Sequence, residues 1–311
     1  MVDYLNVRPT FSESTAFIHQ DLNTGTDTFV PFDFGFDSSY RVGGGYRLNR
    51  CGEEIRFLFT RVTGDDSLVA LPGDIVPFNA APPPDGRTNI HADVDVNAYD
   101  IEWAKTIPLG GQCGGCGDAC GGACGCGDAC GYRCPAWDVT WSGGVRIADV
   151  GWERSYKAFD DTDTLLTDVD TDMNFRGGGL RIGVEGRRYF FKDGWLSLYG
   201  KGNLSLLFGD VDIRTVRITD DGDTVERQNF TSRQLIPVTD LEAGVTAQVT
   251  CHTAITAGYL MSAWHDLGFR NAIDVCDCDG GATVTPLFGT NLDDANILGY
   301  DGFFARIEWA Y

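Results

Sequence analysis

The chain has 311 residues, 43% hydrophobic and 22% charged, a composition that excludes a disordered chain. Its 45 acidic residues outnumber 24 lysines and arginines, and the net charge of −21 excludes nucleic acid as a partner because phosphate binding needs a basic face. There is no apolar run of about 18 residues to predict a transmembrane helix, and no signal peptide is recognisable, so we expect that an exported protein is numbered here as a processed chain.

Alternation of apolar and polar residues with period 2 recurs along the whole chain and predicts β-strands. In the stretch from 194 to 211, for example, Leu198, Leu204 and Leu206 share one face, whereas Ser197 and Asn203 share the other. The pattern predicts ten strands, near residues 2–18, 38–48, 53–63, 91–106, 137–157, 165–190, 194–218, 223–249, 253–268 and 295–311.

Two of these predicted strands are irregular. The first is interrupted around Pro9, within "RPTFSESTAF". In the fourth, Val94 and Val96 are out of phase with Tyr99 and Ile101, which predicts a β-bulge between them.

Strand length separates two all-β architectures. Strands in soluble sandwiches usually have about 5 or 6 residues, whereas several strands here are far longer. Their polar faces carry small residues and mixed charges, and short turns alternate with long polar loops, as in outer-membrane barrels. We therefore expect a single closed antiparallel up-and-down transmembrane β-barrel over residues 1–311, of about ten strands, with twelve strands or a soluble β-sandwich as the alternatives.

The connections fall into two sets. "LNRCGEE", "FFKDGW" and "VTCHTA" are tight turns, which face the periplasm in such barrels. Long acidic loops near 20–37, 64–90, 158–164, 219–222 and 269–294 are expected at the opposite, outer end. Tryptophans provide a second criterion, because aromatic residues gather at the two membrane interfaces. The predicted girdle at the tight-turn end contains Trp103, Trp137, Trp195 and Trp309, and the one at the far end contains Trp152 and Trp264.

The polar strand faces predict what lines the barrel lumen. The expected lining residues are Arg41, Arg47, Glu54, Arg56, Asp138, Arg146, Arg181, Glu185, Arg187, Lys201, Asp240, Glu242, Arg306 and Glu308. Such residues either form a charged eyelet that screens solutes or fill a narrow barrel with ion pairs. The sequence leaves both readings open.

A cysteine-rich insert at 107–136 enlarges what should be a tight periplasmic turn between the fourth and fifth predicted strands. Its cysteines are Cys113, Cys116, Cys120, Cys124, Cys126, Cys130 and Cys134. Cys51 and Cys251 belong to other periplasmic turns, and Cys276 and Cys278 to the outside. Disulfides are expected in an oxidising compartment, with zinc or copper thiolate as the alternative. Both seven and the chain's total of 11 are odd, which favours an intermolecular bond or a free thiol.

Other signals are weaker. Asp168, Asp170 and Asp172 form a D-x-D-x-D pattern that predicts at most weak calcium binding, because Met173 replaces the glycine of a calcium loop. No resident cofactor is expected otherwise. The chain has no G-x-S-x-G, H-E-x-x-H or phosphate-loop motif, so we do not expect an enzyme.

Glycine- and aromatic-rich strands carry a resemblance to a known family. "SYRVGGGYRL", "WSGGVRI", "GGGLRIGVEGRRYFFKDGWLSLYGKGNLSLLFGDV", "VTDLEAGVTAQV" and "TAITAGYL" resemble the Legionella-type major outer membrane protein family, including its planctomycete members. The resemblance covers most strands from residue 38 onward and implies a pore-forming β-barrel in a bacterial outer membrane.

The expected function combines these readings. We expect a porin-like, pore-forming or structural envelope protein that contacts outer-membrane lipid and forms a homo-oligomer, with the insert cross-linking barrels to one another or to a periplasmic partner. The alternative is a non-conducting structural barrel or a surface adhesion or array protein.

Overall fold

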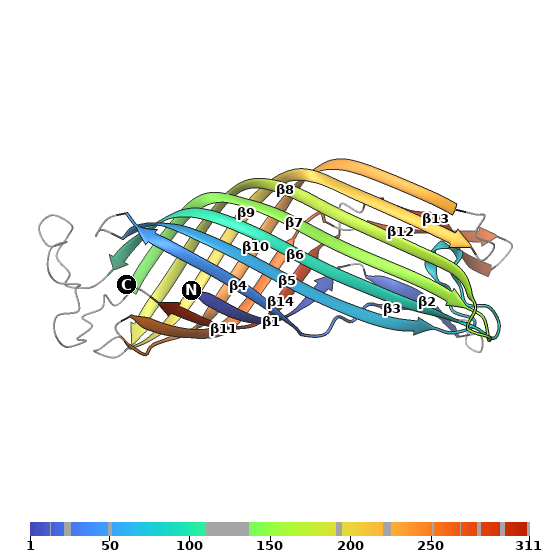
Figure 1. Cartoon of the computed structure of the whole chain (residues 1–311), viewed down its shortest axis with the longest axis horizontal. Helices are drawn as coiled ribbons and strands as arrows, with labels where there is room; N and C mark the ends of the chain where they lie inside the picture. Colours follow the sequence, from blue (N-terminus) through green and yellow to red (C-terminus); the bar gives the residue numbers. More distant parts are fainter. Residues whose placement is uncertain are drawn as a thin grey trace, which may run out of the picture.

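The computed structural model describes residues 1–12, 14–21, 26–48, 52–109, 137–190, 195–219, 225–250, 252–267, 269–278, 281–292 and 296–309. Ten antiparallel strands close into one barrel in the order β1-β14-β11-β10-β9-β8-β7-β6-β5-β4, and β4 pairs with β1 to complete the circle (Figure 1). The predicted fold class and strand number are therefore confirmed, as is the pairing of the first and last strands. Within the described ranges, no helix has the length and apolar character needed to cross a membrane.

The barrel strands differ in length. Four are short: β1 (Val2–Phe11), β4 (Asp37–Arg47), β11 (Thr253–Trp264) and β14 (Leu298–Trp309). Six are long: β5 (Glu53–Ala70), β6 (Arg87–Leu109), β7 (Trp137–Phe159), β8 (Leu165–Phe190), β9 (Leu196–Thr219) and β10 (Val225–Gln248). The long strands extend together beyond the short ones at the end away from the two chain termini (Figure 1). We call the end with the termini basal and the other end distal.

Three smaller elements belong to the distal connections. Strands β2 (Thr15–Asp21) and β3 (Thr26–Pro31) form one hairpin between β1 and β4, and β12 (Phe269–Cys278) and β13 (Gly281–Leu292) form another between β11 and β14. The short 3-10 helix η1 (Pro77–Asn79) lies between β5 and β6 and contacts β12 and β13. The predicted loops 20–37, 64–90 and 269–294 thus contain strands, and the predicted first strand ends at Phe11 instead of residue 18.

On the outer surface of the barrel, the side chains change from apolar to charged between two adjacent outward-facing rows of residues. One cross-strand row is formed by Phe59, Tyr99, Ile147, Gly178, Phe208 and Leu235. The next outward-facing row on the distal side is formed by Arg61, Asn97, Asp149, Arg176, Asp210 and Arg233. Directly opposite residues share a face, so the exterior is apolar on the basal side of this step and charged on the distal side.

The inward face changes in the opposite sense. On β6, Asp100 and Glu102 are buried in the basal interior, whereas Val94 and Val96 are buried in the distal interior. Because β6 pairs with β7 without a register shift from Arg87 to Leu109, the predicted bulge is wrong. The apparent phase change arises because the inward face of this regular strand is polar in its basal part and apolar in its distal part. The distal half thus has an apolar core and a polar exterior, like a water-soluble β-structure.

The same exchange corrects the predicted second aromatic girdle. Trp152 and Trp264 are fully buried inside the barrel. Apolar residues in the distal part of a strand face the barrel interior, whereas apolar residues in the basal part face outward. The basal prediction is different: Trp103, Trp137, Trp195 and Trp309 lie near basal strand ends and are all about half exposed or more, as is Trp141.

Candidate functional site in the barrel interior

The basal interior contains a first cluster of ion pairs beside the seam between the first and last strands. Asp3 faces Arg306 on β14 and Arg41 on β4 directly in the ladder. Arg306 donates to both carboxylate oxygens of Asp3 at 2.9 Å and to Glu242 Oε2 at 3.0 Å. Arg41 also donates to Glu242, and the Tyr199 hydroxyl donates to the same carboxylate at 2.8 Å. Glu242 therefore joins three other side chains to β10.

A second cluster lies against the wall formed by β6, β7 and β8. Arg146 Nε and Nη2 donate to the two oxygens of Asp100 at 2.6 and 2.9 Å. Arg181 Nε donates to Glu102 at 2.5 Å, and its Nη1 donates to Asp240 Oδ2 at 2.6 Å. Asp240 also lies 2.9 Å from Arg146 Nη1. One carboxylate on β10 thus connects two guanidinium groups on β7 and β8.

These contacts cross the lumen. In the barrel order, β11, β14 and β1 separate β10 from β4, and β9 and β8 separate β10 from β7. Glu242 nevertheless reaches Arg41 on β4, and Asp240 reaches Arg146 on β7. Strands that are not neighbours in the barrel are therefore tied together through β10 at two successive inward positions.

The two clusters are almost completely withdrawn from solvent. Their nine charged residues expose at most 8% of their surface: Asp3, Arg41, Asp100, Glu102, Arg146, Arg181, Asp240, Glu242 and Arg306. Burial of a charge is costly unless partners and hydrogen bonds compensate it, and here each of the four guanidiniums contacts at least two carboxylates. This part of the interior is a packed charge network.

A less buried set lies nearer the basal opening. Arg56 and Arg187 both contact Glu185, at 3.4 and 3.2 Å, and Arg56 also pairs with Glu54. The Tyr189 hydroxyl donates to Asp138 at 2.6 Å. Lys201 and Glu308 are also half-buried, whereas Arg47 is exposed.

The structure brings most of the predicted lining residues together and adds three that the sequence reading missed: Asp3, Asp100 and Glu102. All three lie on the polar phase of the alternation, in the two strands that were expected to be irregular. Continuous alternation from Asp100 to Ala104 was the signal that could have identified the last two.

The distal interior is filled by apolar side chains. Phe11 stacks on Trp152 with ring centroids 3.7 Å apart, and Phe78 of η1 packs against Tyr156 at 5.7 Å. Arg217 on β9 donates to the Phe78 carbonyl at 3.1 Å. The connection between β5 and β6 is thus folded into the barrel instead of standing above it.

The β2–β3 hairpin is hydrogen-bonded to the connection between β5 and β6. Ile18 and Ile75 form an antiparallel bridge, with backbone hydrogen bonds of 2.9 and 2.8 Å. His19 Nδ1 lies 2.6 Å from Asp74 Oδ1. Phe32 and Phe34, which follow the hairpin, are buried in the same apolar core. These segments close the distal interior above the charge network.

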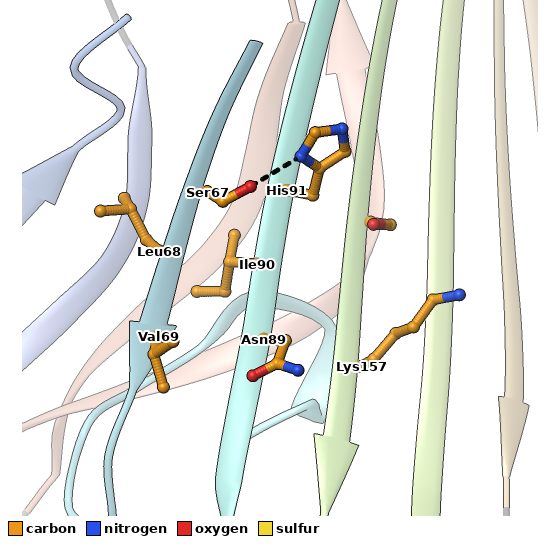
Figure 2. A pocket seen from close by; sticks show the side chains of 8 residues that line it. Ser67, Leu68, Val69, Asn89, Ile90, His91 and Lys157 are labelled. Atoms are coloured by element: carbon orange, nitrogen blue, oxygen red, sulfur yellow. Dashed lines mark hydrogen bonds between the residues drawn. The ribbon is translucent and has the colours of Figure 1, made fainter.

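A shallow depression lies on the outer surface of the distal half, over β5, β6 and β7. Figure 2 shows Ser67 and His91 from neighbouring strands, with the Ser67 hydroxyl 2.9 Å from His91 Nδ1. Asn89 and Lys157 also line it. Ser67 and His91 are directly opposite in the ladder, so the register alone accounts for their contact.

The predicted calcium ligands lie on the same outer surface. Asp168, Asp170 and Asp172 alternate along extended β8 and do not form a loop, and Lys157 lies 3.6 Å from Asp168. No group of three or more His, Cys, Asp or Glu side chains among the described residues is arranged to hold a metal ion. Weak calcium binding stays a prediction.

One cross-strand row on this surface is acidic over four strands: Asp65, Asp93, Glu153 and Asp172. Burial and the neighbouring carboxylates raise the pKa of Glu153, and burial is the main cause of the raised pKa of Asp93. Asp93 and Glu153 are therefore protonated more easily in the folded protein than isolated carboxylic acids are.

The predicted cysteine chemistry lies largely outside the described residues. Cys51, Cys251 and the seven cysteines of the insert fall in undescribed segments, and Cys276 and Cys278 belong to β12, whose side chains are not described. The insert follows Leu109 and precedes Trp137, at the basal ends of β6 and β7.

Comparison with known proteins identifies a family and a solved structure of similar fold. The family described as Legionella pneumophila major outer membrane protein precursor matches residues 137–310, more than half of the chain. The outer membrane protease OmpT from Escherichia coli superposes over 100% of this chain and 95% of its own, with a TM-score of 0.52 and 10% identity. At that identity the similarity is one of fold alone.

Two further structures are more distant. A Pseudomonas aeruginosa FadL homologue and the P. putida toluene transporter TodX have TM-scores of 0.23 and 0.28, with 10% and 8% identity. Each comparison covers 100% of this chain and 89% of the other. A comparison with curated protein sequences finds no match.

Proposed function

Because the chain belongs to the family of the Legionella pneumophila major outer membrane protein, we propose that it acts in the bacterial outer membrane as a structural barrel with a closed lumen. The chain is an outer-membrane β-barrel by family and by fold. The main rival is a diffusion pore, which the sequence reading also allowed.

The apolar basal exterior is the part that fits the membrane. A tilted strand needs about 9–11 residues to cross the hydrocarbon core. On β7, outward residues from Trp137 to Ile147 are mostly apolar, and the charged row begins at Asp149. The long strands continue well past that point, so the distal half stands in water.

The observation that carries the closed lumen is the pair of contacts across it, from Glu242 to Arg41 and from Asp240 to Arg146. A barrel of about eight strands has room only for side chains, whereas about sixteen leave a channel, and ten is near the filled limit. The buried residues of β2 and η1 supply a second obstruction above the network. Both obstructions support a structural role over solute passage.

Single-channel recording in planar bilayers tests this proposal. We expect no stable conductance steps from the purified protein, because solutes have no continuous aqueous path. The variant Arg146→Ser/Asp240→Ser removes both sides of one contact across the lumen and leaves Asp100 beside Arg181, 3.7 Å away, and should raise the frequency of conducting events. Arg176→Ser/Asp149→Ser removes an exposed pair joined at 2.7 Å and serves as the matched control. Reproducible steps from the unmodified protein would establish the pore instead.

Attachment is the second part of the proposed role. The cysteine-rich insert connects the basal ends of β6 and β7, at the end where the chain termini lie (Figure 1). Seven cysteines cannot all pair with one another, which favours a bond to another molecule. We infer that the insert links barrels to one another or to a periplasmic partner.

A further inference from the structure

The distal half contains a strand border with no partner among the described residues. Strand β10 pairs with β9 from Val225 to Ala247. Its pairing with β11 begins only at Val238, opposite Trp264. Among the described residues, the backbone of β10 from 225 to 236 therefore pairs with a strand on one side only.

Pro237 marks the point at which the second ladder stops. Its carbonyl accepts a hydrogen bond from the His265 backbone N–H at 2.9 Å, but proline has no N–H to continue the ladder. Backbone groups of successive strand residues point to opposite sides, so the bond from Pro237 identifies the residues that face the free side. They are the odd-numbered ones: Val225, Arg227, Asn229, Thr231, Arg233 and Leu235.

This border is regular and exposed. The β9–β10 ladder has no register shift along its length. Inward side chains near the border are less covered than those of inner strands, and Phe230 is 39% exposed. Proteins usually protect such an edge with a bulge, a proline within it or a covering segment, because unpaired backbone groups are a template for another strand.

The opposite border of the same sheet is covered. On β5, Thr63 N–H donates to the Ser39 hydroxyl at 3.2 Å. Asp66 Oδ2 accepts from the Asp33 backbone N–H at 2.8 Å. Ser39 of β4 and the segment between β3 and β4 thus cover the free backbone and side chains of β5, whereas no such contact covers the odd-numbered residues 227–235 of β10 among the described residues.

We propose that residues 225–235 of β10 bind an extended strand of another polypeptide that carries carboxylates on one face. The free backbone groups specify an extended chain, by strand addition. The exposed charges on the outward side of the border are the guanidiniums of Arg227 and Arg233, which favour acidic side chains beside them. Arg233 also contacts Asp210 at 3.3 Å but stays 76% exposed.

A second copy of this barrel does not fit the border. Barrels in one membrane are related by an axis along the membrane normal, and their strands tilt by roughly 35–45°. Two such edges would cross at about twice that angle, so they could share only a short contact. The inference uses the location of the distal half in water, and it does not depend on whether the lumen conducts.

A fluorescent peptide tests the border directly. The probe is a short synthetic peptide in which glutamate alternates with valine, titrated against the folded protein in detergent micelles with anisotropy as the readout. We expect saturable binding that weakens with salt, and none by the matching lysine–valine peptide. Alternate N-methylation of the glutamate peptide should abolish binding, because it removes the strand's hydrogen-bond donors.

Two variants locate the binding. Thr231→Pro removes one backbone N–H on the free side, which makes no ladder bond to β9, and should weaken binding about tenfold; it also removes the hydroxyl that donates to Asp212 on β9, a loss that Thr231→Ala shares. Thr231→Ala keeps that N–H and should leave affinity unchanged. Absence of binding by the glutamate peptide, or equal binding to Thr231→Pro and the unmodified protein, would overturn the proposal. Circular dichroism of each variant establishes that the barrel is folded, and conductance separately reports on the lumen.

Discussion

Arg146 and Asp100 stand directly opposite each other on β7 and β6 and are joined by two parallel hydrogen bonds of 2.6 and 2.9 Å. Neither side chain is more than 5% exposed. Their geometry is bidentate, the arrangement in which a guanidinium binds a carboxylate most specifically. Asp240 then joins this pair to β10 across the lumen, so a local cross-strand contact becomes part of the closure of the barrel.

Removal of one partner should destabilise the barrel. We expect Asp100→Ala to lower the free energy of unfolding by about 3 kcal/mol, because it leaves a buried guanidinium with less compensation. Asp100→Leu/Arg146→Met should cost less than the single variant. Asp149→Ala, which breaks an exposed pair with Arg176, should cost less than about 1 kcal/mol. Urea unfolding in micelles measures all three, and equal effects of Asp100→Ala and Asp149→Ala would show that the buried network adds no stability.

The acidic row on the distal surface predicts a pH dependence. The pKa of Glu153 and that of Asp93 are raised in the folded protein, so the folded state holds protons more readily than the unfolded chain. The stability contributed by protonation is fully present below the ordinary carboxylate pKa of about 4. It is lost as pH rises through the raised values.

Glu153→Gln should therefore stabilise the protein at neutral pH, by about 0.2–1 kcal/mol, because it removes like charges from facing positions. The gain should shrink at low pH and in high salt. Thermal unfolding at pH 7 and pH 4, with and without salt, measures it. Asp161→Asn, in the exposed turn between β7 and β8, is the control. A Glu153→Gln variant less stable than the unmodified protein at pH 7 would contradict repulsion within the row.

The two tryptophan environments can be separated with lipids that carry a bromine quencher. A variant that retains only Trp309, which is 64% exposed on the basal outer face, should be strongly quenched. A variant that retains only Trp152, which is fully buried in the distal interior, should not be. Comparable quenching of both would place Trp152 against lipid and contradict the exchange of faces along β7.

Reduction should partly dissociate oligomers. The insert cysteines are expected to be oxidised, with at least one bond to another molecule, so dithiothreitol should release monomers on a gel while each barrel stays folded. The barrel survives because its hydrogen-bonded ladder is closed without the insert. Serine at all seven insert positions should give monomers without reduction. Stoichiometric zinc or copper that a chelator removes would favour the thiolate–metal alternative.

Much of the fold could be predicted from period 2 alone. Alternation in a strand such as β9 determines which residues share a face, whatever surrounds them. The ten-strand barrel, the outward leucines at 198, 204 and 206, and the inward Ser197 and Asn203 all follow from that rule and from strand length. Charged residues on the polar faces also identified most of the interior network in advance.

Only the tertiary structure decided which face is inside at each height, and which charges meet. Alternation distinguishes two faces but does not say which one meets lipid, water or the core, and that assignment reverses between Phe59 and Arg61. Trp152 was misplaced for this reason. The contact between Glu242 and Arg41 was harder still to predict from the sequence. Their strands are separated by three others, and they approach each other only when the sheet closes at one particular register.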